Sequence, residues 1–240
     1  MSSGAGDVAC LLSVLQLADS AFPSGRYTLS YGLEAFAQHG QLSGARRTST
    51  LLTLLGDCIR RGVAPSDGVA LACAHRATET AGIRDLDLVR RADERLTAVK
   101  LVREARDASL RTGRALLATA MAAFDAPALR DYAAGVDHSS FAGNHAVVLG
   151  LLTASLGVPR LDAVAGELYA FAAGWTSAAV RLGLVDHRAA QRLLHRVRPI
   201  SAEAALRAVD RDVEHISSSG PLPDVMAMRH EQAELRLFAS

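Results

Sequence analysis

Cysteine is scarce in this sequence, and neither sign of charge is in excess. The 240 residues include three cysteines, Cys10, Cys58 and Cys73, which lie far apart and form no CxxC pair. This spacing excludes a disulfide framework and favours the reduced, mostly buried thiols of a cytosolic protein. Lysine and arginine together number 26, and aspartate and glutamate 25, which gives a net charge of +1. Because proteins that hold phosphate backbones carry a basic excess, this balance argues against a nucleic-acid partner.

Long apolar runs and an export signal are missing as well. The longest nearly apolar run covers residues 146–158, whereas a membrane-spanning helix needs about 20 residues. An apolar run lies near the N-terminus, but no lysine or arginine precedes Arg26, and a secretory signal needs a positive charge before its apolar part. We therefore expect a soluble, cytoplasmic protein with no membrane partner.

The motifs that mark common active sites are also absent. There is no GxxxxGK[ST] loop for nucleotide phosphates, and no GxSxG, HExxH or CxH…CxxC pattern. The stretch GAGDVA from Gly4 imitates part of a dinucleotide fingerprint, but no strand precedes it. The sequence therefore predicts no catalytic residues, and we do not expect an enzyme.

The eight histidines do not form an obvious metal site. Two pairs, His138 with His145 and His187 with His195, have spacings that could place both rings on one face of a helix. Two turns separate the rings by about 11 Å, which is too far for one metal ion. We expect exposed or hydrogen-bonded histidines and no resident metal.

Pairs of carboxylates lie among arginines, for example Asp93 with Glu94. Their spacing to neighbouring arginines, as from Asp87 to Arg91, is typical of salt pairs on a solvated helix face. We interpret these carboxylates as surface groups.

The sequence does contain helical periodicity almost throughout. Gly62 and Ser66 predict a break between two helices, and Pro199 predicts the end of another. No segment alternates apolar and polar residues long enough for a strand. The sequence thus predicts an all-α fold, a single compact bundle-like domain of roughly ten helices over residues 1–240, with a flexible N-terminus at 1–10 and a C-terminal loop and helix at 217–240. The expected helices cover 8–18, 29–37, 51–62, 66–80, 85–100, 101–124, 128–132, 144–156, 161–182, 187–197, a segment starting at 201, and 225–238.

Four stretches are more polar than their Ala- and Leu-rich surroundings. They cover residues 17–36, 110–120, 177–194 and 217–240. In each, arginines are embedded in apolar sequence, and the planar guanidinium is often used at protein interfaces. One interpretation of these four stretches is that they bind partners. The other is that their arginines are buried and paired, and that the last helix is docked onto the core.

The same four stretches resemble the family of the urease accessory protein UreF. LQLADSAFPSGRYTLSYGLE, residues 15–34, is similar to the family's opening of Leu-Gln-Leu, Pro-x-Gly, an aromatic residue, Ser and Gly-Leu-Glu. Further segments follow in the family's order: RTGRALL from Arg111, NHAVVLGLLTASLGVP from Asn144, AAVRLGLVDHRAAQRLL from Ala178 and DVMAMRHEQAELRLFAS from Asp224. The sequence departs from the family pattern at Arg26, Leu29 and Ala239, where small, aromatic or His, and Arg residues are usual.

The resemblance implies an all-helical, dimeric protein that is not an enzyme. Such proteins bridge UreD (also called UreH) and the GTPase UreG, so that nickel enters the urease apoprotein in a GTP-dependent step. UreD, UreG, urease and a second copy are therefore the expected partners, and nickel is expected in transit at most, with no stably bound cofactor. The residues predicted to bind partners are Tyr27, Ser30, Tyr31, Glu34, Arg114, Arg181, Gln191, Met228, His230, Arg236, Leu237 and Phe238.

Three of these residues carry a geometric prediction. Tyr27, Tyr31 and Glu34 follow i, i+4, i+7, which places them on one face of a helix. We interpret this face as a partner or dimer surface. Alternatives to the scaffold are a modulator of the UreG GTPase, a helical enzyme of the heme-oxygenase or thiaminase type, and a generic helical interaction module.

Overall fold

The computed structural model describes residues 3–219 except 39–41, 43–46 and 80. Helices dominate this part of the chain, and its only strands, β1 (Thr78–Glu79) and β2 (Gly82–Ile83), form one antiparallel pair. The predicted all-α fold class is confirmed. None of the described helices combines the length and apolar character that crossing a bilayer requires. The α-helices are α1 (Ser3–Ala18), α2 (Leu33–Gln38), α3 (Arg47–Asp57), α4 (Val69–Arg76), α5 (Leu86–Val99), α6 (Arg103–Ala123), α7 (Pro127–Asp137), α8 (His145–Ser155), α9 (Arg160–Arg181) and α10 (His187–Ala208).

Helices α4 and α8 form the centre of the core. Residues 69–74 of α4 and residues 145–153 of α8 are all buried. Both sequences are rich in small and aliphatic residues and have no polar face, as expected for helices surrounded by protein. The two helices approach closely at Gly150, where an added Cβ would lie 2.5 Å from the Leu71 carbonyl oxygen. Only glycine fits this crossing.

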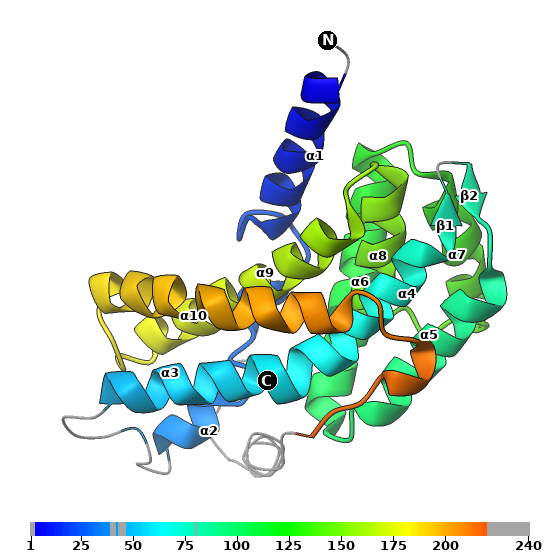
Figure 1. The fold of residues 1–240 in the computed structure, drawn as a ribbon. Helices are drawn as coiled ribbons and strands as arrows, with labels where there is room; N and C mark the ends of the chain where they lie inside the picture. The colour runs from blue at the N-terminus through cyan, green and yellow to red at the C-terminus, as the bar shows by residue number, and fades with distance from the viewer. Residues whose placement is uncertain (1–2, 39–41, 43–46, 80, 220–240) are drawn as a thin grey trace.

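Helix α3 continues into α4 as one rod, through the π-helical segment η2 (Cys58–Gly68) (Figure 1). The predicted break between Gly62 and Ser66 is therefore wrong. The Ser66 hydroxyl lies 2.8 Å from the Gly62 carbonyl oxygen, one turn back along the rod, instead of capping a new helix. Pro65 lies inside this segment. Because proline has no amide hydrogen to donate to the preceding turn, the wider π-type winding accommodates it.

Helices α9 and α10 run antiparallel, and a turn at Gly183 (φ 68°) joins them (Figure 1). The predicted end of the second helix before Pro199 is wrong, because α10 continues to Ala208. Pro199 is exposed, so the carbonyl group that it leaves unbonded faces water rather than the core. Ser201, the expected cap of a following helix, donates to the Val197 carbonyl oxygen at 3.3 Å.

Helix α1 projects from the body of the protein (Figure 1). It already begins at Ser3, so most of the N-terminal segment that was expected to be flexible is helical. Its packing is confined to one side, where the Cys10 thiol lies 3.2 Å from the Gly157 carbonyl oxygen. The apolar stripe that predicted this helix faces solvent, with more than half of each side chain exposed at Val8, Leu11, Leu12 and Leu15.

The three cysteines are free thiols. Cys73 is buried, and Cys10 and Cys58 are half-buried. Burial raises the pKa of the Cys73 thiol to about 11. This thiol is therefore protonated and unreactive at neutral pH.

Candidate functional site

The polar segment that opens the family resemblance, residues 19–32, folds as a series of turns. The Asp19 carboxylate accepts the amide of Ala21 at 2.8 Å, which closes the first turn after α1. Later in this segment, positive φ angles occur at three residues: Gly25 (75°), Tyr31 (54°) and Gly32 (79°). A positive φ is unusual for a tyrosine and costs about 1 kcal/mol. Contacts elsewhere in the fold must therefore hold this segment in place.

The strongest of these contacts is a buried ion pair between Arg26 and Glu167. Two guanidinium nitrogens of Arg26 donate to the two carboxylate oxygens of Glu167, at 2.6 and 3.0 Å. The side chains are 17% and 5% exposed, so water screens the pair weakly. This parallel arrangement is the strongest geometry available to an arginine and a carboxylate. It ties the turn at residues 25–28 to helix α9.

His145, the first residue of α8, joins the same cluster. Its Nε2 atom lies 3.2 Å from a guanidinium nitrogen of Arg26. Since a guanidinium can only donate, Nε2 accepts, and the ring proton is on Nδ1. Burial, and then the positive charge of Arg26, lower the pKa of His145 to about 3. The imidazole is therefore neutral at physiological pH, and the 3.9 Å approach of His145 to Glu167 is not an ion pair.

The pKa values of the other two members follow from the same geometry. Burial raises the pKa of Glu167, although Arg26 acts in the opposite direction. Burial alone would lower the pKa of Arg26, but Glu167 and the nearby Tyr31 hydroxyl raise it instead. The cluster thus contains one fixed positive charge, one carboxylate that is paired with it and one neutral ring.

A second ion pair lies across a cavity from the first. The Lys100 ammonium group is 2.8 Å from the Asp67 carboxylate, and both side chains are 14% exposed. The Ser66 hydroxyl also donates to Asp67, at 2.8 Å. Burial would raise the pKa of Asp67, but Lys100 and Ser66 lower it. The cavity has a volume of about 210 Å³, is bordered by both ion pairs and His145, and opens beside Ser218.

A buried carboxylate on α5 positions His145. Asp93 is fully buried and accepts the backbone amides of Ala142, Gly143 and Asn144 at 2.6–3.1 Å. It also accepts the Tyr132 hydroxyl at 2.8 Å. These bonds fix the loop that starts α8. The interpretation of Asp93 as a solvated surface group is therefore wrong.

The other charge pairings on α5 also differ from the prediction. Arg90 binds both Asp87 and Glu94, while Arg91 pairs with Glu214. The predicted Asp87–Arg91 pair does not form, because the i, i+3 partner of Asp87 is closer.

The histidine pairs separate in a similar way. His138 follows the end of α7, whereas His145 begins α8, so the two rings do not share a helix. His187 and His195 both lie on α10 and are exposed. Among the described residues, no group of three or more His, Cys, Asp or Glu side chains is placed to hold a metal ion.

The residues predicted to form one partner-binding helix face are not on one helix. Tyr27 is in a 3-10 turn, Tyr31 lies in the positive-φ turn, and Glu34 belongs to α2. Tyr31 packs its ring edge-on against Phe171, with centroids 4.8 Å apart. Glu34 is 1% exposed, and Ser30 is fully buried. The prediction of a shared helix face is therefore wrong, because Gly25 and Gly32 turn the chain inward. The role of these residues in partner binding stays a prediction.

The remaining predicted partner residues lie at scattered places. Arg114 on α6 and Gln191 on α10 are exposed. Arg181, at the end of α9, is half-buried and donates to the Leu29 carbonyl oxygen at 3.4 Å. The other predicted residues lie outside the described part of the chain: Met228, His230, Arg236, Leu237 and Phe238.

The sequence-based prediction missed most of the buried polar cluster. It considered His145 only as half of a histidine pair and noted Arg26 only as a departure from the family pattern. The signal for Glu167 was a lone acidic residue in the interior of an Ala-rich helix. Its partner is 141 positions away in sequence, a separation that no local pattern encodes.

Comparison with known proteins identifies the family of this chain. A family model described as UreF matches residues 45–198. A protein of Trichodesmium erythraeum (strain IMS101) named urease accessory protein UreF is 30% identical over 238 residues, covering 98% of both chains. The chain belongs to the UreF family. The urease accessory protein UreF 2 of Brucella canis is 32% identical, over 95% of this chain and 91% of its own. The UreF protein of Kocuria rhizophila is 30% identical, over 97% and 98%.

The UreF family match covers most of the buried polar cluster but not all of it. Glu167, His145, Lys100 and Asp67 lie inside the matched residues, whereas Arg26 precedes them. The expected departure from the usual UreF pattern at Arg26 therefore stays a prediction. The Arg26–Glu167 ion pair is thus a feature of this chain that the match to the UreF model does not include.

Proposed function

We propose that this protein is a non-enzymatic scaffold of urease maturation, which bridges UreD (UreH) and the GTPase UreG for GTP-dependent insertion of nickel into urease. The observation that carries the proposal is similarity at 30–32% identity, over nearly the whole chain, to proteins named urease accessory protein UreF. Similarity over the full length supports a shared role more strongly than a match to one segment.

The distribution of surface residues supports a binding role. Helix α1 exposes four large apolar side chains in one stripe. Monomeric proteins rarely leave such contiguous apolar surface open to water, and it is typical of protein interfaces. A homodimer, UreD and UreG are the partners that we propose for surfaces of this kind, in the cytoplasm.

Nickel is cargo in this proposal and not a resident cofactor. Four charged groups around the cavity are paired with one another, Arg26 with Glu167 and Lys100 with Asp67. A carboxylate in a strong ion pair is a poor metal ligand, because the metal must displace its cationic partner. Weak retention suits a protein that passes a metal on.

A narrower variant of the function is stimulation or gating of the UreG GTPase. It would require an exposed arginine that reaches the nucleotide, since arginine can stabilise the charge that develops during phosphoryl transfer. Arg114 is one of many exposed arginines and belongs to the residues predicted to bind partners, so it serves as the first to be tested. Comparing GTP hydrolysis by UreG with the wild-type protein and with Arg114→Ala tests this variant.

Assembly from purified components tests the scaffold. The protein is mixed with UreD and UreG and separated by size-exclusion chromatography with light scattering. We expect one peak that contains all three chains, and pairwise mixtures show which contact this protein provides. Separate peaks for all components at micromolar concentration would contradict the proposal.

A further inference from the structure

Helix α10 carries a dense set of basic side chains on its solvent face. Between positions 187 and 198 the sequence has six basic residues and no Asp or Glu. All six are exposed, while the aliphatic residues between them pack into the core. The basic residues are His187, Arg188, Arg192, His195, Arg196 and Arg198. The four arginines of this set alone carry four positive charges, whereas the chain as a whole has a net charge of only +1, so this is a local concentration of charge.

The helical repeat arranges these residues into one surface. At 100° per residue, Arg188, Arg192 and His195 lie along the outermost line of α10. The same line continues through Pro199 to Leu206, which is 62% exposed. At 1.5 Å per residue it extends for about 27 Å. We call this line and its flanking arginines the α10 surface.

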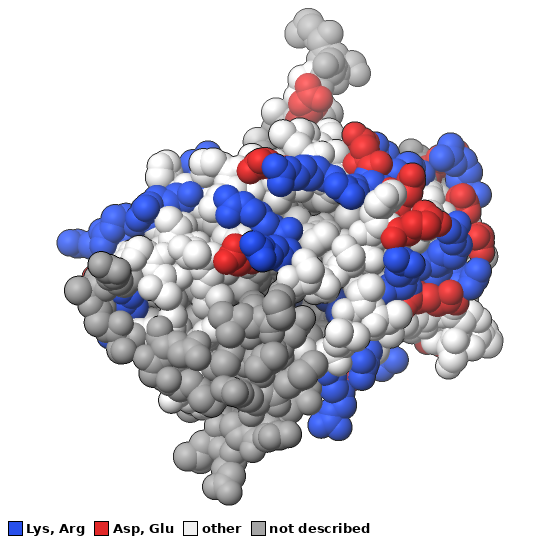
Figure 2. Space-filling model, turned by 60° about the horizontal axis from the view of Figure 1, so that its bottom comes forward, with Lys and Arg blue, Asp and Glu red and all other residues white. Residues whose placement is uncertain are grey.

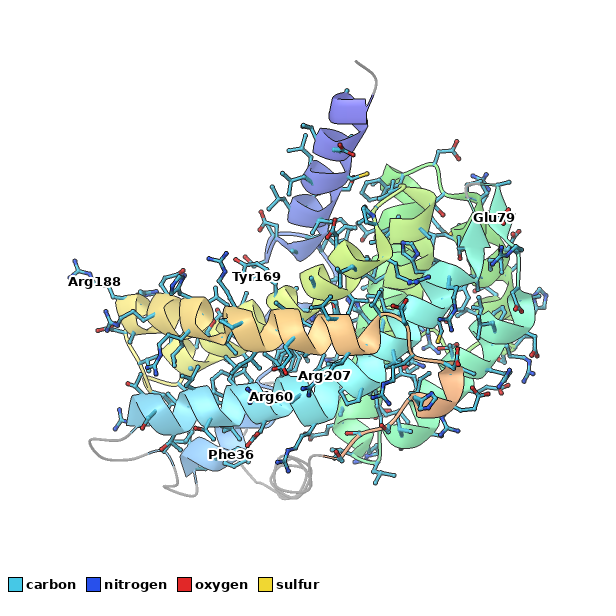
Figure 3. All side chains as sticks on the ribbon, viewed as in Figure 1. Phe36, Arg60, Glu79, Tyr169, Arg188 and Arg207 are labelled. Atoms are coloured by element: carbon cyan, nitrogen blue, oxygen red, sulfur yellow. The ribbon has the colours of Figure 1, made fainter. Side chains whose placement is uncertain are left out.

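Asp186 precedes the α10 surface and caps the helix by accepting the Ala189 amide at 2.6 Å, and the arginines at the start of this surface form no ion pair within the described residues. Within the part of the chain that the structure describes, no carboxylate lies within 4.0 Å of Arg188, Arg192, Arg196 or Arg198. By contrast, Arg207 on the same helix pairs with Glu203 at 2.6 Å. Figure 3 shows Arg188 extending from the far end of α10. Figure 2 shows several separate blue groups across the left and upper part of its view, with white surface and some red groups between them.

The basic area extends onto the neighbouring rod. Gly56 of α3 lies against Ile200 of α10, and an added Cβ there would be 3.1 Å from Ile200 and 3.4 Å from the Arg60 guanidinium. Arg60 is exposed, so its charge lies beside the middle of α10 (Figure 3). Arg60 therefore adds one positive charge close to α10.

We propose that the α10 surface binds an acidic surface on one of the maturation partners, with the exposed Leu206 seated against an apolar part of that partner. The inference rests on the proposed function and adds the position and the chemistry of one contact. Complementary charge accelerates association and selects the partner, while an apolar residue inside the contact slows dissociation.

Two other occupants fit the α10 surface less well. A second copy of the chain, bound through a two-fold axis at the middle of this face, would place the arginine end of one α10 against the Leu206 end of the other, so neither end would meet its complement. A nucleic acid would match the charges, but a phosphate backbone offers nothing apolar for Leu206, and the chain lacks an overall basic excess. An acidic protein surface satisfies both the charged and the apolar ends.

Charge reversal on α10 tests the proposal. The variant Arg188→Glu/Arg192→Glu is compared with Arg103→Glu/Arg130→Glu, which makes the same change of charge at exposed positions of α6 and α7, outside the stretches predicted to bind partners. UreD and UreG are immobilised separately, and association and dissociation rates are measured at 50 and 300 mM NaCl. Thermal melting of both variants checks that they fold.

We expect the α10 variant to bind one of the two partners roughly tenfold more weakly at low salt, mainly through slower association, and less so at high salt. The control variant Arg103→Glu/Arg130→Glu should bind like the wild type, and Leu206→Ser should mainly speed dissociation. Equal binding of the wild type and the α10 variant to both partners would overturn the inference while leaving the proposed function intact.

Two further results would also overturn the inference. If the wild-type protein binds neither UreD nor UreG, the proposed function fails and the α10 contact with it. A fluorescent 20-base-pair DNA duplex serves as the second probe. Tight binding of this duplex by the wild type at 150 mM NaCl, lost in the α10 variant, would assign the surface to nucleic acid instead.

Discussion

Replacing Arg26 with methionine would leave the charge of Glu167 buried without a counter-charge. The two hydrogen bonds at 2.6 and 3.0 Å would be lost, and the neighbouring His145 cannot replace the charge, because it is neutral with a pKa of about 3. Removing one partner of a buried ion pair costs about 3–5 kcal/mol of unfolding free energy. For a chain of this length, we expect the melting temperature to fall by about 6–20 °C.

The loss should depend on pH, and the pKa of Glu167 determines the direction. The pKa of this carboxyl is raised by burial above its usual value of 4.5, and Arg26 now limits the rise. Without Arg26 the pKa rises further. Between the usual and the raised value the folded state binds more protons than the unfolded state, so stability falls as pH increases through this interval. The variant should therefore be closest to the wild type near pH 4.5 and furthest from it at pH 8.

Urea unfolding at pH 5 and pH 8 measures this difference, with two control variants. Arg207→Met removes an exposed arginine that is paired with Glu203, and we expect a loss of at most about 1 kcal/mol, independent of pH. The double variant Arg26→Met/Glu167→Leu removes both charges and should recover most of the stability, because well-packed apolar residues can replace a buried ion pair. The reasoning is refuted if Arg26→Met loses less than about 1 kcal/mol at pH 8, or if the double variant is no more stable than the single one.

Three further predictions concern the core and metal binding. Asp93→Ala removes the acceptor for three backbone amides and should destabilise the protein by at least about 3 kcal/mol. Asp87→Ala, on the exposed side of the same helix, should cost less than about 1 kcal/mol. Comparable losses of stability in the two variants would contradict the anchoring role of Asp93. Gly150→Ala places a Cβ 2.5 Å from the Leu71 carbonyl oxygen and should lower the unfolding free energy, measured with denaturant, by about 1–3 kcal/mol. The control Gly62→Ala, whose Cβ would meet nothing within 4 Å, should not destabilise the protein. Calorimetry should show nickel binding weaker than micromolar, since the described residues contain no cluster of three or more suitable ligands; tight binding at one metal per chain, lost on changing a single His or Cys, would disprove this.

The helices were predictable where a cap or a stop residue agreed with the hydrophobic pattern. Helix α5 begins after Asp85, whose carboxylate accepts the Leu88 amide at 2.9 Å, as expected for a capping residue. Helix α6 ends shortly before Pro127, which becomes the first residue of α7. In such places the local sequence determines the boundary by itself, because the capping bond involves only neighbouring residues.

The same signals failed where tertiary packing overrode them. Pro199 does not end α10, because the face that loses a hydrogen bond is solvated and the opposite face remains packed against the core. Gly62 and Ser66 do not divide the rod, since η2 is packed along α10 and gains more from continuing as a helix than from a break. Breaker residues indicate a local preference, and the fold decides whether that preference is followed.

The buried polar cluster could not be predicted for a different reason. Asp93 and Glu94 are adjacent and chemically alike, yet Asp93 is fully buried and Glu94 is 59% exposed on its side chain. Their positions differ by 100° around the helix, and only the packing of α5 against the loop before α8 decides which one is buried. Similarly, the sequence shows Arg26 and Glu167 as isolated charges, and the folded chain pairs them.

The buried cluster and the exposed surfaces perform separate tasks in this arrangement. The turn at Tyr31 and Gly32 has positive φ angles and would relax if nothing held it. The Arg26–Glu167 pair ties this segment to α9, and the Tyr31 ring against Phe171 adds a second contact to the same helix. A buried ion pair adds little net stability compared with apolar packing, but it favours one conformation over its alternatives. A segment held in this way keeps α2 and the cavity wall in one geometry, while α1 and α10, whose outer faces contribute little to the core, remain available for partners. In a protein proposed to align other chains, rigidity inside and open faces outside are the properties that such alignment requires.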